Sequence, residues 1–310
     1  EYLTVFLNTK YGIADVKRRA RISINQSNVS ASELQKVEIP ILNMPIQSKI
    51  KKLFDDSFNF RINSIKLYKQ AEEILLKELN LKYHKPEHKL SYNAKLSEVL
   101  NSKRIDADYY QPKYKEIEQK IKNYHLGSKP LSEVIKVKNK NFFPEDDKKY
   151  DYFELSNISS YGYIIGCTKD LGKNLPSRAR RKVRKGDVII SSIEGSLESC
   201  ALITDEYDGA LCSTGFFVIN SKTINSETLL VLVKSIIMQN LLKRGCKGTI
   251  LTAISKDELD KIEIPLIKDS IQKDISQKIN ESYKLRRESK ELLKKAKKMV
   301  EEEIGKNASK

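Results

Sequence analysis

The sequence predicts an α+β fold: a mainly antiparallel β domain accompanied by two long helices that pack against each other. Ten of the 12 glycines lie within residues 127–248, a stretch of short β-type runs. Two other stretches, 45–79 and 269–304, lack internal Gly and Pro and are rich in Lys, Glu, Leu and Ile, as expected of helices. Finally, the peptide KVEIPIL at 36–42 recurs as KIEIPLI at 261–267.

The recurring peptide belongs to a longer internal repeat. Pro40 and Pro265 lie 225 positions apart, and the same offset aligns the chain without a gap over roughly 45 residues. Matched residues of the two copies include Ser30, Glu33, Leu34, Ile46, Gln47 and Ile50 in the first, and Ser255, Glu258, Leu259, Ile271, Gln272 and Ile275 in the second. A duplicated unit explains this correspondence better than chance does.

The central part of the chain predicts a compact antiparallel β unit. Short runs of strand-forming residues are separated by Gly, Asp and Asn turns. These runs are residues 151–155, 161–166, 186–192, 199–204 and 213–220. Residues 226–244 then show helical spacing. Together these elements predict one α+β domain.

The two long helices should each span about 50 Å at a rise of 1.5 Å per residue. Every seventh position carries a small or apolar residue. One row is Ile50, Ser57, Ser64 and Ala71, and the other is Ile275, Ser282, Ser289 and Ala296. Because small residues let two helix backbones approach closely, the rows predict a helix pair packed along its length. The alternative is a single amphipathic helix lying on a globular body.

Residues 83–104 are interpreted as a polar connector, followed by a helix from Pro112 to about Asn123. His84 and His88 in the connector are four residues apart, the spacing of a metal pair on a helix. Pro86 lies between them and breaks the helical face that such a pair needs. The two histidines are therefore interpreted as loop residues.

The composition favours a polyanionic partner, because 57 Lys and Arg against 41 Asp and Glu give a net charge of +16. That partner is nucleic acid or, less plainly, an acidic membrane surface; the alternative is a lysine-rich surface without a specific role. No apolar run is long enough to span a bilayer and no secretory signal opens the chain, so we expect a soluble, cytoplasmic protein. The four cysteines lack C-x-x-C spacing, which indicates buried free thiols.

Motifs of several enzyme classes are absent from the sequence. It contains neither G-x-G-x-x-G nor G-x-x-x-x-G-K-[ST], and no Asn/Asp-Pro-Pro-aromatic tetrapeptide of amino-methyltransferases. The Glu-x-Lys matches of a metal-dependent nuclease fall in predicted helices or in the connector. Three histidines without a paired Ser or Cys give no support for nucleophilic catalysis. We therefore predict a binding protein with no catalytic residue, no metal site and no cofactor.

The strongest candidate for binding is the basic segment SRARRKVRKGD, residues 177–187. Arginine can contact phosphates and read guanine edges, whereas lysine mostly supplies charge. The alternative is an edge strand whose charges prevent aggregation. The predicted DNA-binding residues are Lys138, Lys140, Asn157, Ser160, Tyr161, Arg178, Arg180, Arg181, Lys182, Arg244, Lys247 and Thr249.

Four stretches resemble the specificity (S) subunits of type I restriction-modification systems and related fused enzymes. They are RIDADYYQPKY (104–114), RRKVRKGDVIISS (180–192), GALCSTGFFVIN (209–220) and GTILTAISKDELDKIEIPLI (248–267). The resemblance follows the family's order and covers nearly the whole chain. It implies target recognition domains that each read part of a bipartite DNA site, and two spacer helices that form an antiparallel coiled coil. It also implies that the helices dock two adenine-methyltransferase (modification) subunits, with a restriction or translocase subunit as a further partner.

The resemblance also implies a domain plan, which departs from the family pattern at its start. Residues 1–44 would be the C-terminal remnant of a first recognition domain, 45–82 the first spacer helix, 83–103 a connector, 104–268 a complete recognition domain, 269–306 the second spacer helix and 307–310 a tail. Since the first residue is Glu1, we expect upstream sequence or another chain to complete the first domain. Two alternatives stay open: the C-terminal specificity region of a longer fused methyltransferase and restriction enzyme, and a non-catalytic coiled-coil adaptor.

Overall fold

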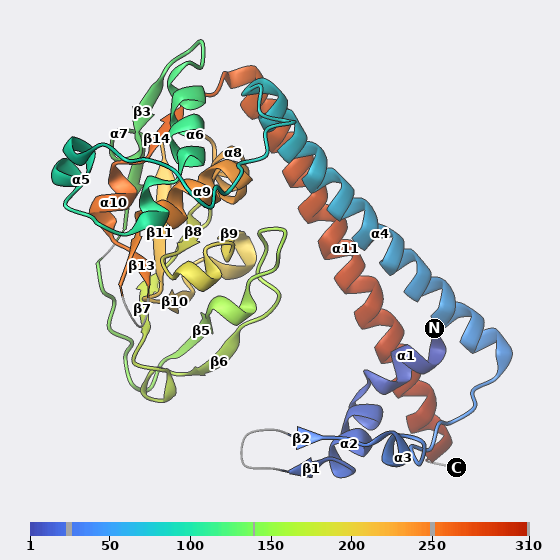
Figure 1. The fold of residues 1–310 in the computed structure, drawn as a ribbon. Helices are drawn as coiled ribbons and strands as arrows, with labels where there is room; N and C mark the ends of the chain where they lie inside the picture. Colours follow the sequence, from blue (N-terminus) through green and yellow to red (C-terminus); the bar gives the residue numbers. More distant parts are fainter. Residues whose placement is uncertain (23–26, 139, 249–251, 309–310) are drawn as a thin grey trace. The chain divides into compact units, whose positions relative to one another are not determined.

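The computed structural model describes residues 1–22, 27–138, 140–248 and 252–308, and the chain divides into two compact units (Figure 1). Unit 1 comprises residues 1–67 and 281–310, and unit 2 comprises residues 68–280. The boundary falls inside both long helices, α4 (Met44–Glu78) and α11 (Asp269–Ala308). Both helices lie close to their predicted bounds.

Unit 1 begins with short elements that pack on the long helices. They are α1 (Tyr2–Leu7), α2 (Lys10–Arg18), the antiparallel pair β1 (Arg21–Ile22) and β2 (Ser27–Asn28), and α3 (Ala31–Leu34). One apolar core joins them to the helix pair, and it contains Val5, Phe6, Val37, Leu42, Ile50, Ala296 and Val300. The short elements at the start of the chain therefore pack against α4 and the C-terminal part of α11.

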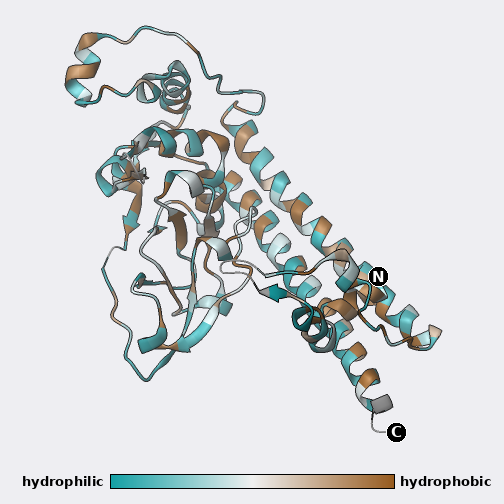
Figure 2. Cartoon of the chain, turned by 60° about the horizontal axis from the view of Figure 1, so that its bottom comes forward, coloured by the Kyte–Doolittle hydropathy of each residue, from teal (hydrophilic) through white to brown (hydrophobic). Residues whose placement is uncertain are grey.

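Within unit 1 the two long helices run antiparallel and touch through small side chains. The hydroxyl of Ser57 donates to the carbonyl oxygen of Ser289 at 2.8 Å, and the hydroxyl of Ser282 donates to the carbonyl oxygen of Ser64 at 2.8 Å. A serine hydroxyl reaches the opposite backbone only where the helices lie close together. Figure 2 shows apolar residues recurring along both helices. The predicted pairing through the heptad rows is confirmed.

Unit 2 is built around two four-stranded sheets. The first has the order β6-β5-β10-β7 and the second the order β4-β11-β8-β9. The strands of the first sheet are β5 (Lys149–Phe153), β6 (Thr168–Leu171), β7 (Ala179–Lys182) and β10 (Leu211–Ser213). Those of the second are β4 (Ile135–Val137), β8 (Val188–Ser191), β9 (Cys200–Leu202) and β11 (Phe216–Ser221).

Apolar side chains from both sheets share one core, which includes Phe153, Ile189 and Phe216. In the part of the chain that the structure describes, every strand pairing is antiparallel except that of β5 with β10. The predicted α+β class with a mainly antiparallel β domain is confirmed.

Helices and short strand pairs surround these sheets. The helices are α5 (Leu96–Ser102), α6 (Pro112–Lys122), α7 (Leu131–Val134), α8 (Ser226–Lys234), α9 (Ile236–Gly245) and α10 (Lys256–Asp260). The strand pairs are β3 (Ser128–Pro130) with β14 (Glu263–Pro265) and β12 (Cys246–Lys247) with β13 (Ala253–Ile254). Single 3-10 turns are η1 (Ala107–Tyr110), η2 (Leu155–Asn157), η3 (Gly172–Asn174), η4 (Glu194–Ser196) and η5 (Asp205–Tyr207). None of the described helices is both long and apolar enough to cross a bilayer.

Three predicted elements differ from the structure. Residues 161–166 form no strand: Gly162 has φ +78° and a turn closes between Ser159 and Gly162, which leaves one isolated bridge between Ile158 and Ile164. The predicted helix 226–244 is two helices, because Ser235 is extended and its hydroxyl caps α9 by accepting from the Met238 amide. The connector contains the helix α5.

The internal repeat is reproduced in hydrogen bonds at the same offset of 225 residues. Ser30 caps α3 by accepting from the Glu33 amide, and Ser255 caps α10 by accepting from the Glu258 amide. The side-chain amide of Gln47 donates to the Leu42 carbonyl oxygen at 2.7 Å, and that of Gln272 donates to the Ile267 carbonyl oxygen at 2.9 Å. The two copies therefore share local geometry as well as sequence.

Candidate nucleic-acid interface

Strand β7 carries three of the six basic residues of the segment and lies at an edge of its sheet. On one side it pairs antiparallel with β10, and Ala179 points into the core. On the other side the chain near Phe142 runs alongside, and the Phe142 amide donates to the Arg180 carbonyl oxygen at 2.8 Å. Part of the basic segment is therefore an edge strand, as the alternative interpretation expects. An edge strand with a charged outer face can also serve as a binding surface.

Two cationic side chains of β7 lie over aromatic rings of the neighbouring segment. The guanidinium of Arg180 lies 4.9 Å from the ring centre of Phe143, and the ammonium of Lys182 lies 4.7 Å from that of Phe142. Arg181 donates to the side-chain oxygen of Asn141 at 2.8 Å. Phe143 is 70% exposed although it is apolar. We define the basic–aromatic strip as Lys140, Phe142, Phe143, Arg178, Arg180, Arg181 and Lys182.

The cations of the basic segment fall into two groups. Arg184 pairs with Asp208 at 3.5 Å, and Lys185 pairs with Asp205 at 2.7 Å. Among the described residues, no carboxylate pairs with Arg178, Arg180 or Lys182. The positive charge available to a polyanion is therefore concentrated in the strip, not spread over the whole segment.

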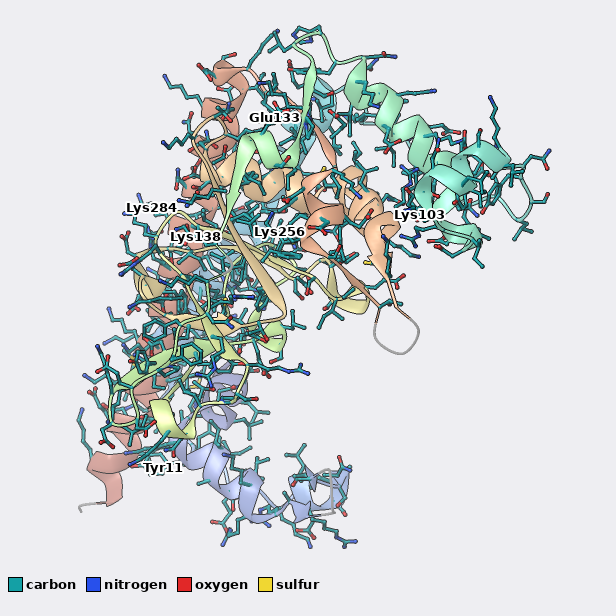
Figure 3. All side chains as sticks on the ribbon, turned by 90° about the vertical axis from the view of Figure 1, so that its left-hand side faces the viewer. Tyr11, Lys103, Glu133, Lys138, Lys256 and Lys284 are labelled. Atoms are coloured by element: carbon teal, nitrogen blue, oxygen red, sulfur yellow. The ribbon has the colours of Figure 1, made fainter. Side chains whose placement is uncertain are left out.

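Lys138, another predicted site residue, is engaged by a buried carboxylate. The Asp187 side chain is only 2% exposed and accepts from the Lys138 ammonium at 2.7 Å, the Asn220 amide at 3.2 Å and the Arg184 backbone amide at 2.9 Å. These three bonds satisfy a charge that would otherwise be costly to bury. Lys138, labelled in Figure 3, thus ties the end of β4 to the turn before β8, whereas Lys140 is exposed.

Three predicted residues lie in the turn after β5. The Asn157 side-chain oxygen accepts from the Glu154 amide at 2.9 Å and closes the turn. The Tyr161 ring packs edge-on against Tyr68 of α4, with the ring centres 5.7 Å apart. Ser160 is exposed and lines an open groove of about 450 Å³ together with Glu194, Asn240 and Lys243 among others. Asn157 and Tyr161 therefore have packing roles.

The remaining predicted residues lie near the end of α9. Arg244 is 16% exposed, pairs with Glu118 at 2.6 Å and lies over the ring of Tyr109. Lys247 pairs with Glu258 at 2.9 Å. Thr249 lies outside the described residues. The structure thus brings together the strip residues Lys140, Arg178, Arg180, Arg181 and Lys182. The other predicted residues that it describes lie elsewhere.

A family model described as the type I restriction modification DNA specificity domain matches residues 125–297, more than half of the chain. The chain belongs to this family. The match includes the whole basic–aromatic strip and the second copy of the repeat. It also includes three of the four sequence stretches that carry the family resemblance, which is confirmed.

Three solved structures are similar to this chain. A chain from a study of complex assembly and conformational transition of the type I R-M system is 28% identical, with a TM-score of 0.43, and the match covers 53% of this chain and 45% of that one. The HsdS subunit from Thermoanaerobacter tengcongensis is 28% identical, with a TM-score of 0.42, over 48% of this chain and 40% of that one. The S subunit from M. genitalium is 15% identical, with a TM-score of 0.42, and the match covers 96% of this chain and 71% of that one.

The chain spans less than half the length of the first two of these structures. A search of curated proteins finds no match.

Sequence reasoning missed two residues of the strip in this specificity domain, Phe142 and Phe143. Both lie in the run KNKNFFP at 138–144, where two aromatic residues follow two lysines and two asparagines. Aromatic rings interleaved with cations are typical of nucleic-acid surfaces, because rings can stack on bases while cations hold phosphates. That pattern could have identified them.

Three of the four thiols of the specificity domain, those of Cys200, Cys212 and Cys246, are buried, and that of Cys167 is partly buried. Burial raises the pKa of Cys200 to about 11 and that of Cys246 to about 12. A nucleophilic cysteine needs the thiolate form near neutral pH, so neither thiol suits that role. Within the described ranges, no group of three or more His, Cys, Asp and Glu side chains is placed to hold a metal ion.

Proposed function

We propose that the chain is the DNA-recognition component of a type I restriction-modification system and is itself non-catalytic. The observation that carries the proposal is the basic–aromatic strip, which lies inside the region matched by the specificity-domain model. Arg178, Arg180 and Lys182 supply charge for phosphates, and the exposed ring of Phe143 offers a stacking or groove contact.

The long helices supply the second part of the proposed function. In this proposal they set the distance between two DNA half-sites and dock modification subunits that methylate adenine, two per chain, with a restriction or translocase subunit as a further partner. The complex would act on double-stranded DNA in the cytoplasm. The close helix packing at Ser57 and Ser64 supports a stiff spacer, because a paired helix bends less than a single one.

The test compares unpaired with paired cations in the same segment. The variant Arg178→Ala/Arg180→Ala/Lys182→Ala should lower DNA affinity and reduce the slope of log K against log salt by about 2 to 3, since each lost phosphate contact removes about 0.9. The matched control Arg184→Ala/Lys185→Ala also removes positive charges, but from groups that already pair with Asp208 and Asp205. Its slope should change by less than about 1.

Three outcomes would contradict the proposal. An unchanged salt slope in the first variant would remove the strip from the interface. Selection from random duplex DNA, performed with the modification subunits present, should enrich one bipartite sequence; no enrichment would support the coiled-coil adaptor instead. A methyltransferase activity carried by the same polypeptide would support the fused enzyme.

A further inference from the structure

The arginines of unit 2 differ in how their side chains are held. Four of them pair with a side-chain oxygen: Arg104 with Asp106, Arg181 with Asn141, Arg184 with Asp208 and Arg244 with Glu118. The other two, Arg178 and Arg180, belong to the basic–aromatic strip. In the described part of the chain, the Arg178 side chain donates no hydrogen bond, whereas that of Arg180 donates one.

The guanidinium of Arg180 is held on one side and open on the other. Its Nε donates to the Ser177 carbonyl oxygen at 3.1 Å, and the group lies over the ring of Phe143, 4.9 Å from the ring centre. The backbone is held too, because the Phe142 amide donates to the Arg180 carbonyl oxygen. Among the described residues, nothing accepts a hydrogen bond from the terminal nitrogens Nη1 and Nη2. Arg180 therefore presents a pair of free N–H donors from a fixed position.

Such a donor pair matches guanine better than any other base. In the major groove guanine presents two acceptors, N7 and O6, whereas adenine presents one acceptor and one donor, and cytosine presents a donor. Because arginine has donors only, guanine is the base that takes both bonds. A guanidinium that is already held also loses less conformational freedom when it binds.

Phe143 favours a base contact over a phosphate contact at Arg180. The Phe143 ring is 70% exposed beside the guanidinium. A phenyl ring offers a phosphate neither a hydrogen bond nor a charge. Inside a groove the same ring can contact base edges, for example the methyl group of thymine. Arg178 and Lys182, which no described carboxylate neutralises, remain to hold phosphates.

We infer that Arg180 reads a guanine of the DNA half-site through Nη1 and Nη2, and that Phe143 is the positioning residue that holds its guanidinium. This role rests on the proposed function of DNA recognition, and it adds which base is read and which residue reads it. The half-site that unit 2 recognises therefore contains at least one guanine.

Binding-site selection from random duplex DNA, with the full chain and the modification subunits, tests this role. Arg180→Ala should lower the preference for one guanine at least about tenfold, because it removes a bidentate base contact. The matched control Arg178→Ala removes the same charge, so it should weaken binding to all sequences alike and reduce the salt slope by about 0.9. Phe143→Ala should also lower the guanine preference, whereas Phe143→Tyr, which keeps the ring, should retain it.

Base analogues at the selected guanine locate the contact. With 7-deazaguanine, which lacks the N7 acceptor, the wild-type chain should bind about tenfold more weakly and the Arg180→Ala chain should change by less than about twofold. Hypoxanthine keeps N7 and O6, so the wild-type chain should bind it about as well as guanine.

The two proposals fail in different ways. An Arg180→Ala chain that selects the same sequence as the wild-type chain would overturn the guanine contact and leave DNA recognition standing. Equal binding of guanine and 7-deazaguanine by the wild-type chain would do the same. A wild-type chain that enriches no sequence would overturn both.

Discussion

Residues 1–78 and 226–303 build the same series of elements twice, with different neighbours. In each copy two short helices, a two-residue strand pair and a one-turn helix precede a long helix. The first helical junction also matches, displaced by one residue from the offset of 225. Thr9 donates to the Phe6 carbonyl oxygen and caps the Gly12 amide, and Ser235 donates to the Leu232 carbonyl oxygen and caps the Met238 amide.

The copies differ where a partner element is present in only one of them. Glu263–Pro265 is a strand because β3 pairs with it, whereas Glu38–Pro40, which has the same three residues, is not a strand. Caps, turns and helix cores depend on nearby residues, so the repeat specifies them in both places. A strand depends on a partner that lies far away in the sequence, so the same residues form it only once. Within one chain, the repeat thus distinguishes structure that nearby residues specify from structure that needs a distant partner.

The largest expected difference between the copies concerns the equivalent isoleucines 39 and 264. Ile264→Asp should destabilise unit 2 by at least about 3 kcal/mol, because it buries an unpaired carboxylate between β3 and the core. Ile39→Asp should change the stability of the isolated chain by less than about 1 kcal/mol, because the side chain is already partly solvated. Urea unfolding followed by circular dichroism measures both. Equal losses would show that Ile39 is covered in the isolated chain.

The same contrast explains how far the sequence could predict the structure. The long helices, the α+β class and the repeat follow from local spacing, such as the serine rows that place Ser57 against Ser289. The break at Ser235 was missed because its apolar neighbours keep helical spacing while the serine caps a new helix. The short strands β3 and β14 were missed because their pairing joins residues 128–130 to 263–265.

At the candidate site, too, local patterns could be predicted from the sequence and contacts between distant residues could not. The basic segment was found because its charges are adjacent in the sequence, and the structure places its first part in the basic–aromatic strip. Which cations are neutralised could not be predicted, because Asp187, Asp205 and Asp208 reach Lys138, Lys185 and Arg184 through the fold. Arg244 illustrates the point: its partner Glu118 is more than a hundred residues away in the sequence.

A smaller difference is expected for the equivalent glutamines 47 and 272. Gln272 is buried, donates to the carbonyl oxygens of Ile267 and Thr223, and accepts from the Asn225 amide at 2.8 Å. Gln272→Ala should therefore cost about 2 to 3 kcal/mol, since it leaves several buried polar groups unsatisfied. Gln47→Ala loses the bond to the Leu42 carbonyl oxygen, in a more exposed place, and should cost about 1 kcal/mol. Equal costs by urea unfolding would contradict this, because Thr223 and Asn225 would then add nothing.

The smallest difference is expected for the equivalent glutamates 33 and 258. Burial raises the pKa of Glu258, but hydrogen bonds from Lys247 and Lys261 outweigh burial and hold that pKa below its usual value of 4.5. The pKa of Glu33 is lowered chiefly by its hydrogen bond from Lys36, and the Glu33 side chain is more exposed than that of Glu258.

A lowered folded-state pKa stabilises the protein above the unfolded-state pKa, and that stability is lost as the pH falls through the folded-state value. The wild-type chain should therefore lose stability below pH 4.5, and Glu258→Gln should reduce that loss by at most about 1 kcal/mol. Glu33→Gln should change the acid dependence less, and added salt should remove its effect, because exposed ion pairs are screened. Urea unfolding on both sides of pH 4.5, at low and high salt, measures these slopes. A larger effect for Glu33→Gln would mean that the first copy is more enclosed in solution than its exposed Leu34 and Ile39 indicate.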